Sequence, residues 1–289
     1  MAEYSPMMQH YLATKAEYKD CILFYRLGDF YEMFFDDALV VSKELELTLT
    51  GKDCGQEERA PMCGVPFHAA ETYINRLVSN GHKVAICEQM EDPKQAKGIV
   101  KREVIKVVTP GTNLNSQALD ETKNNYLMSI VYLGDVLGVA IADYSTGDFF
   151  VTEIKTGAEL IDEINKFVPS EIILNEYFAM SGIDLTFISE KLSVSVSTLE
   201  NWYFDDDSCK AKLKEHFHVN MLDGLGIKDY PVGIDAAGAL LIYLTQTQKS
   251  DMSHITSIVP YTTGKYMLID SSSSCLLYTS DAADDLTRV

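Results

Sequence analysis

The sequence predicts an α/β protein with a mixed order of helices and strands, divided into two domains. Its 289 residues, of which 46% are hydrophobic and 23% charged, suffice for two buried cores. The first part of the chain alternates short apolar runs with stretches of helical periodicity, whereas residues 126–154 hold three strand-like runs in quick succession. A polar stretch at 111–125 separates the two patterns. We therefore place one domain at residues 1–118 and a second at 119–248.

Helix and strand signals define the first domain in chain order. Ser5 and Pro6 are typical of a helix start, with Ser as the N-cap and Pro in the first turn. Asp36 and Asp37 favour a second helix start through the helix dipole, and Gly81 favours a helix end. The expected elements are a helix from residue 6, a strand at 21–27, an extended segment at 30–34, a helix at 36–45, a strand at 47–50, a helix around 70–77 and a strand at 83–88.

Short turns join the first strands of the second domain. Gly134 and Asp135, and then residues 145–147, are short enough to connect three strands as antiparallel hairpins. The expected elements are strands at 126–133, 136–143 and 147–154, a helix around 160–167 that Pro169 stops, a strand at 172–174, and helices at 205–217 and 231–248. Three antiparallel strands followed by a helix and a strand is the chain order of a ribonuclease-H-like sheet, which we expect here.

Composition excludes several classes of protein. The longest apolar run, at 236–244, has 9 residues, far fewer than the ~20 needed to span a bilayer, so no membrane partner is expected. The N-terminus lacks a basic segment followed by an apolar one, so no secretory signal is expected. The six cysteines have no CxxC spacing, which indicates reduced thiols in a cytoplasmic protein. No cluster stands at metal-ligand spacing, so no metal site is predicted.

The segment 24–34 carries the strongest functional signal. It has the pattern of a strand, a Gly-Asp turn and a second extended run. Because alternate residues of an extended run project from the same face, Phe30 and Glu32 point together and Tyr31 points the other way. An aromatic ring can wedge into or stack on a base step, and a carboxylate can accept a hydrogen bond from a base edge. Because phosphates repel a carboxylate, the pair favours inspection of bases over simple adhesion to a backbone.

The net charge of −19 is the main objection to a nucleic-acid partner. Residues 1–119 hold 13 Lys+Arg against 17 Asp+Glu, a net charge of −4, so most of the acidity lies later in the chain. By default we interpret a basic stripe at 94–106 as a solvated charge run, with phosphate contact as the alternative. Its cations are Lys94, Lys97, Lys101, Arg102 and Lys106. Lys52, in a glycine-flanked loop, is a further candidate for a contact with a nucleic-acid backbone.

Five short motifs follow one another along the chain. They are Ser-Pro-Met-Met-Gln-His-Tyr (5–11), Phe-Tyr-Arg-Leu-Gly-Asp-Phe-Tyr-Glu-Met-Phe (24–34), Pro-Met-Cys-Gly-Val-Pro-Phe-His-Ala (61–69), Val-Ala-Ile-Cys-Glu-Gln (84–89) and Val-Thr-Pro-Gly-Thr (108–112). Each motif alone is weak, whereas the ordered set is a specific signal. Together they resemble the bacterial MutS family of mismatch-recognition proteins, from residue 5 to about residue 273.

The resemblance implies a mismatch-recognition domain followed by a connector domain. The N-terminal domain of the family carries a Phe-x-Glu motif, which Phe30 and Glu32 match. By resemblance, the ring stacks on a mispaired base from the minor groove of double-stranded DNA, and the carboxylate hydrogen-bonds that base. Leu27 and Met62 match apolar positions that line the groove nearby. The connector domain of the family is ribonuclease-H-like in shape without being a nuclease.

The resemblance also implies what this chain lacks. Family members continue through a lever-and-clamp region to an ATPase that provides the main dimer contacts, but no G-x-x-x-x-G-K-[ST] occurs here. We therefore expect a non-enzymatic fragment without a cofactor, since ATP and Mg²⁺ belong to the missing part. Residues 249–274 would be the start of the core or lever domain. For the full-length protein, the implied partners are a second copy of itself and downstream repair proteins.

Two other interpretations of the residues stay open. Four acids cluster early in the chain: Asp29, Glu32, Asp36 and Asp37. With Asp143 near a strand end of the second domain, such carboxylates could hold Mg²⁺ and cleave phosphodiesters. However, Asp36 and Asp37 suit a helix start, and Asp143 has no evident carboxylate partner. The acidic second domain would also suit a protein-docking module.

The last residues, 275–289, differ from the rest of the chain. After Ser273 the family would continue with basic residues and an Asn-Leu-Glu-Leu run, whereas Cys-Leu-Leu-Tyr-Thr-Ser follows here from residue 275. This segment resembles the translation of a transposase adaptor from a sequencing library. We therefore expect it to be non-native and exclude it from the fold prediction.

Overall fold

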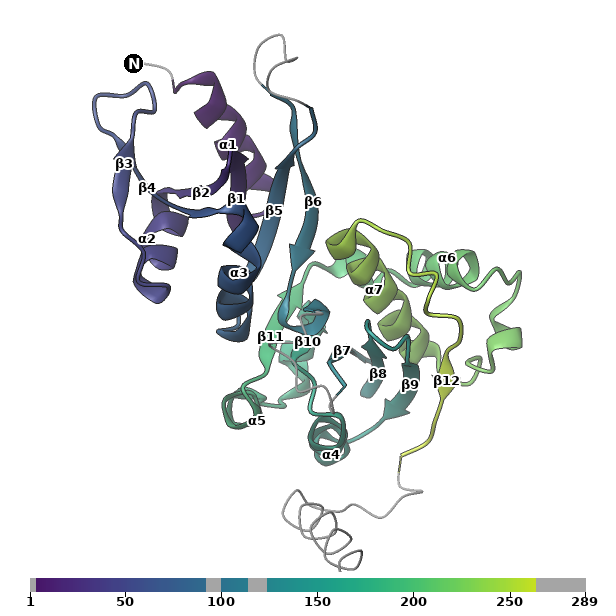
Figure 1. The fold of residues 1–289 in the computed structure, drawn as a ribbon. Helices are drawn as coiled ribbons and strands as arrows, with labels where there is room; N and C mark the ends of the chain where they lie inside the picture. The colour runs from purple at the N-terminus through teal and green to yellow at the C-terminus, as the bar shows by residue number, and fades with distance from the viewer. Residues whose placement is uncertain (1–3, 92–99, 114–123, 264–289) are drawn as a thin grey trace, which may run out of the picture.

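The computed structural model describes residues 4–91, 100–113 and 124–263, and within them the chain forms two six-stranded sheets (Figure 1). One sheet belongs to the N-terminal part and the other to the later part, which confirms two mixed α/β domains. Lys94, Lys97, most of the polar linker and residues 275–289 lie outside the described residues. In the described part, no helix is long and apolar enough to cross a membrane.

The N-terminal domain surrounds a sheet with three helices. Its main elements are α1 (Pro6–Glu17), β1 (Cys21–Leu27), β2 (Phe30–Phe34), α2 (Phe35–Glu44), β3 (Thr50–Lys52), β4 (Ala60–Pro66), α3 (Ala70–Ser79), β5 (Lys83–Gln89) and β6 (Arg102–Val108). A short 3-10 turn at Phe67–Ala69 (η1) connects β4 to α3, and another at Pro110–Thr112 (η2) follows β6. The strand order is β3-β4-β2-β1-β5-β6, in which β1 and β2 form an antiparallel hairpin and β5 runs parallel to β1.

Alternation along β1 gives this sheet two apolar faces. On one face, Met8 and Tyr11 of α1 pack in a cluster with Tyr25. On the other face, residues of α2 and α3 pack in a cluster with Phe24. Because Phe24 and Tyr25 are neighbours on a strand, α1 lies on the opposite side of the sheet from α2 and α3 (Figure 1).

The second domain has the expected ribonuclease-H-like strand order. Its elements are β7 (Tyr126–Leu133), β8 (Val136–Asp143), β9 (Phe149–Ile154), α4 (Gly157–Phe167), β10 (Glu171–Asn175), η3 (Glu176–Ser181), α5 (Thr186–Leu192), β11 (Ser195–Leu199), η4 (Asn201–Phe204), α6 (Asp206–His216), η5 (Leu222–Leu225), α7 (Pro231–Gln248) and β12 (Val259–Pro260). β7, β8 and β9 are antiparallel, and β10 then joins β7 in parallel. The sheet order is β11-β10-β7-β8-β9-β12.

Two glycines allow α7 to approach its neighbours closely. A Cβ atom added at Gly138 of β8 would lie 2.1 Å from the carbonyl oxygen of Val232 in α7. A Cβ atom added at Gly238 of α7 would lie 2.3 Å from the Cβ atom of Cys209 in α6. These positions therefore fix α7 between the sheet and α6, while α4 and α5 contribute to the core on the other face.

A buried cluster joins the two domains. The carboxylate of Glu171, at the start of β10, is fully buried and accepts hydrogen bonds from the Tyr243 hydroxyl (2.6 Å) and the Gly111 N–H (3.2 Å). The ammonium of Lys83, on β5 of the first domain, lies 3.6 Å from it. The amide of Gln248 on α7 also donates to the Val107 carbonyl on β6 (3.2 Å). The edge of the first sheet is therefore anchored to the second domain.

The structure corrects the expected elements in several places. The strand expected at 47–50 instead spans Thr50–Lys52, so Lys52 lies on β3 and not in a loop. β4, β6, α5 and β11 were not expected. The signal of β4 was hidden because Pro61, Gly64 and Pro66 are weak strand formers. Ser5 precedes α1 as expected, but its side chain makes no capping hydrogen bond.

Residues beyond 248 continue to pack on the second domain. Met252 and Ile255 belong to the core cluster under α7, and β12 pairs in parallel with β9. The side chain of Thr152 on β9 donates to the carbonyl of Tyr261 (2.7 Å). The described chain therefore remains part of the second domain to this point, and a further domain starting at 249 stays a prediction.

A buried acid between α6 and α7 makes the stability of the second domain dependent on pH. Asp235 of α7 is buried, and desolvation, reinforced by the charge of Asp206, raises the pKa of Asp235 to about 7. An acid whose pKa is raised by folding binds its proton more tightly in the folded state. It therefore stabilises the fold at acid pH, and this contribution is lost as the pH rises through 7.

We expect Asp235→Asn, which keeps a neutral side chain at every pH, to raise the free energy of unfolding at pH 8 by about 1–3 kcal/mol. Near pH 4 the variant should match the wild type, because Asp235 is then protonated in the folded state. Urea titrations of the whole chain at both pH values measure the difference. Asp207→Asn, at an exposed neighbouring acid, is the control and should change little. Equal or lower stability of Asp235→Asn at pH 8 would contradict this assignment.

Candidate nucleic-acid interface

Strand register places the Phe-x-Glu pair on the face of the N-terminal sheet that α1 partly covers. Phe30 lies opposite Leu27 across the β1–β2 hairpin, and directly opposed residues of antiparallel strands share a face. Glu32 and Phe34 follow on the same face at intervals of two. Phe34 belongs to the cluster under α1 together with Tyr25, which confirms which face this is.

This face also includes Met62 and Lys52. Met62 on β4 lies opposite Phe34 on one side and opposite Thr50 on the other. Lys52 is two residues beyond Thr50 on β3, so it projects from the same side. The five residues predicted from the sequence, Leu27, Phe30, Glu32, Lys52 and Met62, therefore share one face, which we call the Phe30 face.

Burial differs sharply among the residues of the Phe30 face. Phe30 keeps 46% of its surface exposed, beyond the cluster that α1 covers. Leu27 and Met62 are half-buried and pack against that cluster. The exposed Phe30 ring is therefore available to contact a partner, while Leu27 and Met62 are held against the core.

Glu32 forms an ion pair with Lys52 across β4. The Glu32 side chain is 15% exposed and the Lys52 side chain 31% exposed, and the Lys52 ammonium also lies 5.7 Å from the centre of the Phe34 ring. Gly64 lies opposite Glu32 on β4, where an added Cβ atom would come within 3.5 Å of the Glu32 Cγ atom. No local sequence pattern predicts this pair, because Glu32 and Lys52 are 20 residues apart in the chain and meet only across the sheet.

The hairpin that carries Phe30 is held at its tip. Gly28 adopts a positive φ of 58°, which a side chain would strain, and the Phe67 N–H donates to the Asp29 carbonyl (2.9 Å). The guanidinium of Arg26 lies 3.9 Å from the centre of the Phe67 ring. The tip is therefore tied to the end of β4, which fixes the position of Phe30.

The described part of the basic stripe is solvated at Lys101 but not at Arg102. Arg102 is buried and donates to the carbonyl oxygens of Arg26 and Val100, each at 2.8 Å. Lys101 is exposed but pairs with Glu103 (2.7 Å). The default interpretation was therefore wrong for Arg102, which has a structural role.

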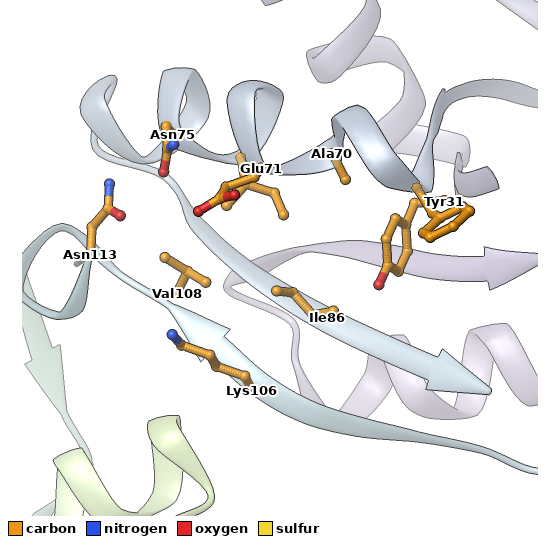
Figure 2. A pocket seen from close by; sticks show the side chains of 10 residues that line it. Tyr31, Ala70, Glu71, Asn75, Ile86, Lys106, Val108 and Asn113 are labelled. Carbon is orange, nitrogen blue, oxygen red and sulfur yellow. The ribbon is translucent and has the colours of Figure 1, made fainter. Parts of the chain in front are cut away.

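Lys106 lines a cavity on the opposite face of the sheet. The cavity has a volume of about 350 Å³ and lies between α3 and strands β5 and β6, with Ile74, Ile86 and Val108 among its walls (Figure 2). Burial lowers the pKa of Lys106. Tyr31 also lines this cavity, so the cavity and the Phe30 face lie on opposite sides of the sheet.

Two of the carboxylates proposed for a nuclease are held by hydrogen bonds within the protein. Asp37 is buried and accepts from Lys15 (2.9 Å) and from the Leu23 N–H (3.0 Å), so it joins α1, β1 and α2. Asp143 is buried in the second domain and accepts from the backbone N–H groups of Asn125 (3.0 Å) and Ser145 (2.7 Å). Among the described residues, no group of three His, Cys, Asp or Glu side chains is arranged to hold a metal ion.

Comparison with known proteins agrees with this two-domain division. The family described as MutS domain I matches residues 5–117, and the family described as MutS domain II matches residues 125–256. The DNA mismatch repair protein MutS of Lachnoclostridium phytofermentans is 62% identical over 273 residues, which cover 94% of this chain and 29% of that protein. MutS of Ruminiclostridium cellulolyticum is 53% identical, with 94% and 31% covered. This chain therefore spans less than a third of the length of these relatives.

We expect duplex DNA to stay intact when it is incubated with this chain and Mg²⁺ or Mn²⁺, because hydrogen bonds within the protein occupy the oxygens of Asp37 and Asp143. End-labelled strands separated on denaturing gels measure cleavage. Metal-dependent nicking that disappears in Asp29→Ala or in Asp143→Asn would restore the nuclease interpretation.

Proposed function

This chain belongs to the MutS family, of which it carries domains I and II, and we propose that it recognises mispaired or unpaired bases in double-stranded DNA. The observation that supports this function best is the exposed Phe30 ring beside Glu32 on the same face of the β1–β2 hairpin. The ring supplies an apolar stacking surface, and the carboxylate supplies a hydrogen-bond acceptor for a base.

Phe30 stacks on the mispaired base from the minor groove in this proposal. Insertion of a ring between base pairs unstacks a step, at a cost of a few kcal/mol. That cost is lowest where pairing and stacking are already defective, so a mismatch accepts the ring more readily than a matched step. Phe30 therefore discriminates through the deformability of the DNA as well as through direct contact.

Glu32 and the remaining residues of the Phe30 face complete the interface. The Glu32 carboxylate accepts a hydrogen bond from the displaced base, and a base that offers no donor leaves the charge facing phosphates. Leu27 and Met62 contribute apolar contact along the groove, and Lys52 contributes a phosphate contact. In this assignment the carboxylate supplies selectivity and the cation supplies affinity.

Other activities of the family protein fall outside this chain in our proposal. The relatives are about three times as long as this chain. We assign ATP hydrolysis, its Mg²⁺ and the main dimer contacts to the part of the relatives that this chain does not cover. We regard this chain as a non-enzymatic DNA-recognition unit of a cytoplasmic repair protein. No step of the recognition described above requires a cofactor.

A protein-docking role for the second domain is a second candidate. Met180 on η3 and Phe187 on α5 are 76% and 75% exposed, although both are apolar. The part of the chain after residue 119 also carries most of the negative charge. A domain that contacts downstream repair proteins would present such side chains, and this role is compatible with DNA recognition by the first domain.

Phe30→Ala should lower affinity for a mismatched duplex roughly tenfold or more, because base–aromatic stacking is worth ~1–3 kcal/mol per base. Affinity for the matched duplex, which phosphate contacts dominate, should change little. Fluorescence anisotropy with labelled duplexes measures both values, and circular dichroism checks the fold. Phe187→Ala, at an exposed phenylalanine of the second domain, is the matched control. Unchanged mismatch binding by a folded Phe30→Ala would exclude the stacking role.

Glu32→Ala should reduce discrimination in a different way. It removes one hydrogen bond to the mispaired base and also removes a charge that phosphates repel. Binding to matched DNA should therefore be unchanged or slightly stronger, and the ratio of mismatched to matched affinity should fall. Glu32→Gln should behave similarly on matched DNA and retain part of the mismatch affinity. If Glu32→Ala weakened matched and mismatched binding equally, the carboxylate would have no role in selectivity.

A further inference from the structure

The Glu32 carboxylate is paired with a cation before any DNA is present. Lys52 on β3 reaches Glu32 on β2, although β4 separates the two strands. Gly64 on β4 lies opposite Glu32, and because glycine has no side chain, the Lys52 side chain can cross β4 at this position. Two residues predicted to bind different parts of DNA are therefore bound to each other in the free protein.

We propose that Lys52 and Glu32 form an exchangeable ion pair that couples phosphate binding to base recognition. In the free protein Lys52 neutralises Glu32. On a mismatch the pair separates, since Glu32 finds a donor on the displaced base and Lys52 finds a phosphate. This inference rests on the proposed function and adds that the two contacts form together or not at all.

The exposure of the pair suits such an exchange. Both side chains keep contact with water, with 31% of Lys52 and 15% of Glu32 exposed. Because water and salt reach a partly exposed ion pair and screen it, this pair is less costly to open than a fully buried one when better partners are offered. In the described part of the chain, Lys52 is the ion-pair partner that the structure gives to Glu32.

Matched DNA does not complete the exchange. Opening the pair would let Lys52 contact a phosphate but would leave Glu32 without a donor and close to other phosphates. Repulsion of the bare carboxylate then offsets the new phosphate contact. Lys52 therefore remains paired on matched DNA and contributes an ionic contact only where a defective base pair engages Glu32.

The dependence of affinity on salt measures this coupling directly. Each phosphate neutralised by a cation steepens the slope of log affinity against log salt by about 0.9. We expect the wild-type slope to be steeper on mismatched than on matched duplex by about one such contact. Lys52→Met should abolish the difference, and Lys52→Arg should keep it. Lys43→Met removes a charge from exposed Lys43 on α2, on the opposite face, and should leave the difference intact.

Glu32→Gln supplies a second, independent readout. Without the carboxylate, Lys52 is free on every duplex, so affinity for matched DNA should rise slightly, by about twofold, and its slope should steepen to the mismatch value. Both changes should disappear in the double variant Glu32→Gln with Lys52→Met. Urea titrations confirm that each variant is folded before its slopes are compared.

The outcomes separate this inference from the proposed function. Equal wild-type slopes on the two duplexes, or a slope difference that survives Lys52→Met, would overturn the exchange while Phe30→Ala still lowers mismatch affinity. The exchange would also be overturned if Glu32→Gln changed the affinity and slope on matched DNA equally in the wild-type and the Lys52→Met background. If Phe30→Ala has no effect on mismatch binding, or if the wild-type chain binds no duplex even at low salt, the proposed function itself fails.

Discussion

The position of the Phe30 face depends on the register of β2 between β1 and β4. Side chains alternate along a strand, so a slip of one residue would bury Phe30 and Glu32 and expose their neighbours. Core packing prevents this slip, because Met33 is fully buried and the hydroxyl of buried Tyr31 donates to Glu88 on β5 (2.7 Å). The exposed face is therefore specified by the buried side of the same strand.

Two ion pairs of opposite character occur in this molecule. Glu171 is fully buried, accepts a hydrogen bond from Tyr243 and lies close to Lys83. Removal of Lys83 would leave the Glu171 carboxylate buried without a compensating charge. Such a cluster fixes the arrangement of the two domains. The pair between Glu32 and Lys52 keeps contact with water, so it is less costly to open than the buried pair. Burial thus distinguishes a structural ion pair from one that is available for exchange.

The sequence predicted the elements whose apolar runs are long and bounded by turns. The strands at Cys21–Leu27, Tyr126–Leu133 and Val136–Asp143 and the helix at Pro231–Gln248 have the expected bounds. β4 escaped prediction because its prolines and glycine resemble a loop, and it forms only because β2 and β3 pair with it on either side. Neighbouring strands here override a weak local preference.

By itself, the sequence determined that Phe30 and Glu32 project together, because the alternation of an extended strand is a local property. It also carried the ordered motifs that identify the family. Only the tertiary structure decided that Lys52 meets Glu32 and that Arg102 is buried instead of solvated. Both outcomes depend on which strands become neighbours in the sheet, since contacts between distant segments arise from packing of the whole domain and have no signature in any one segment.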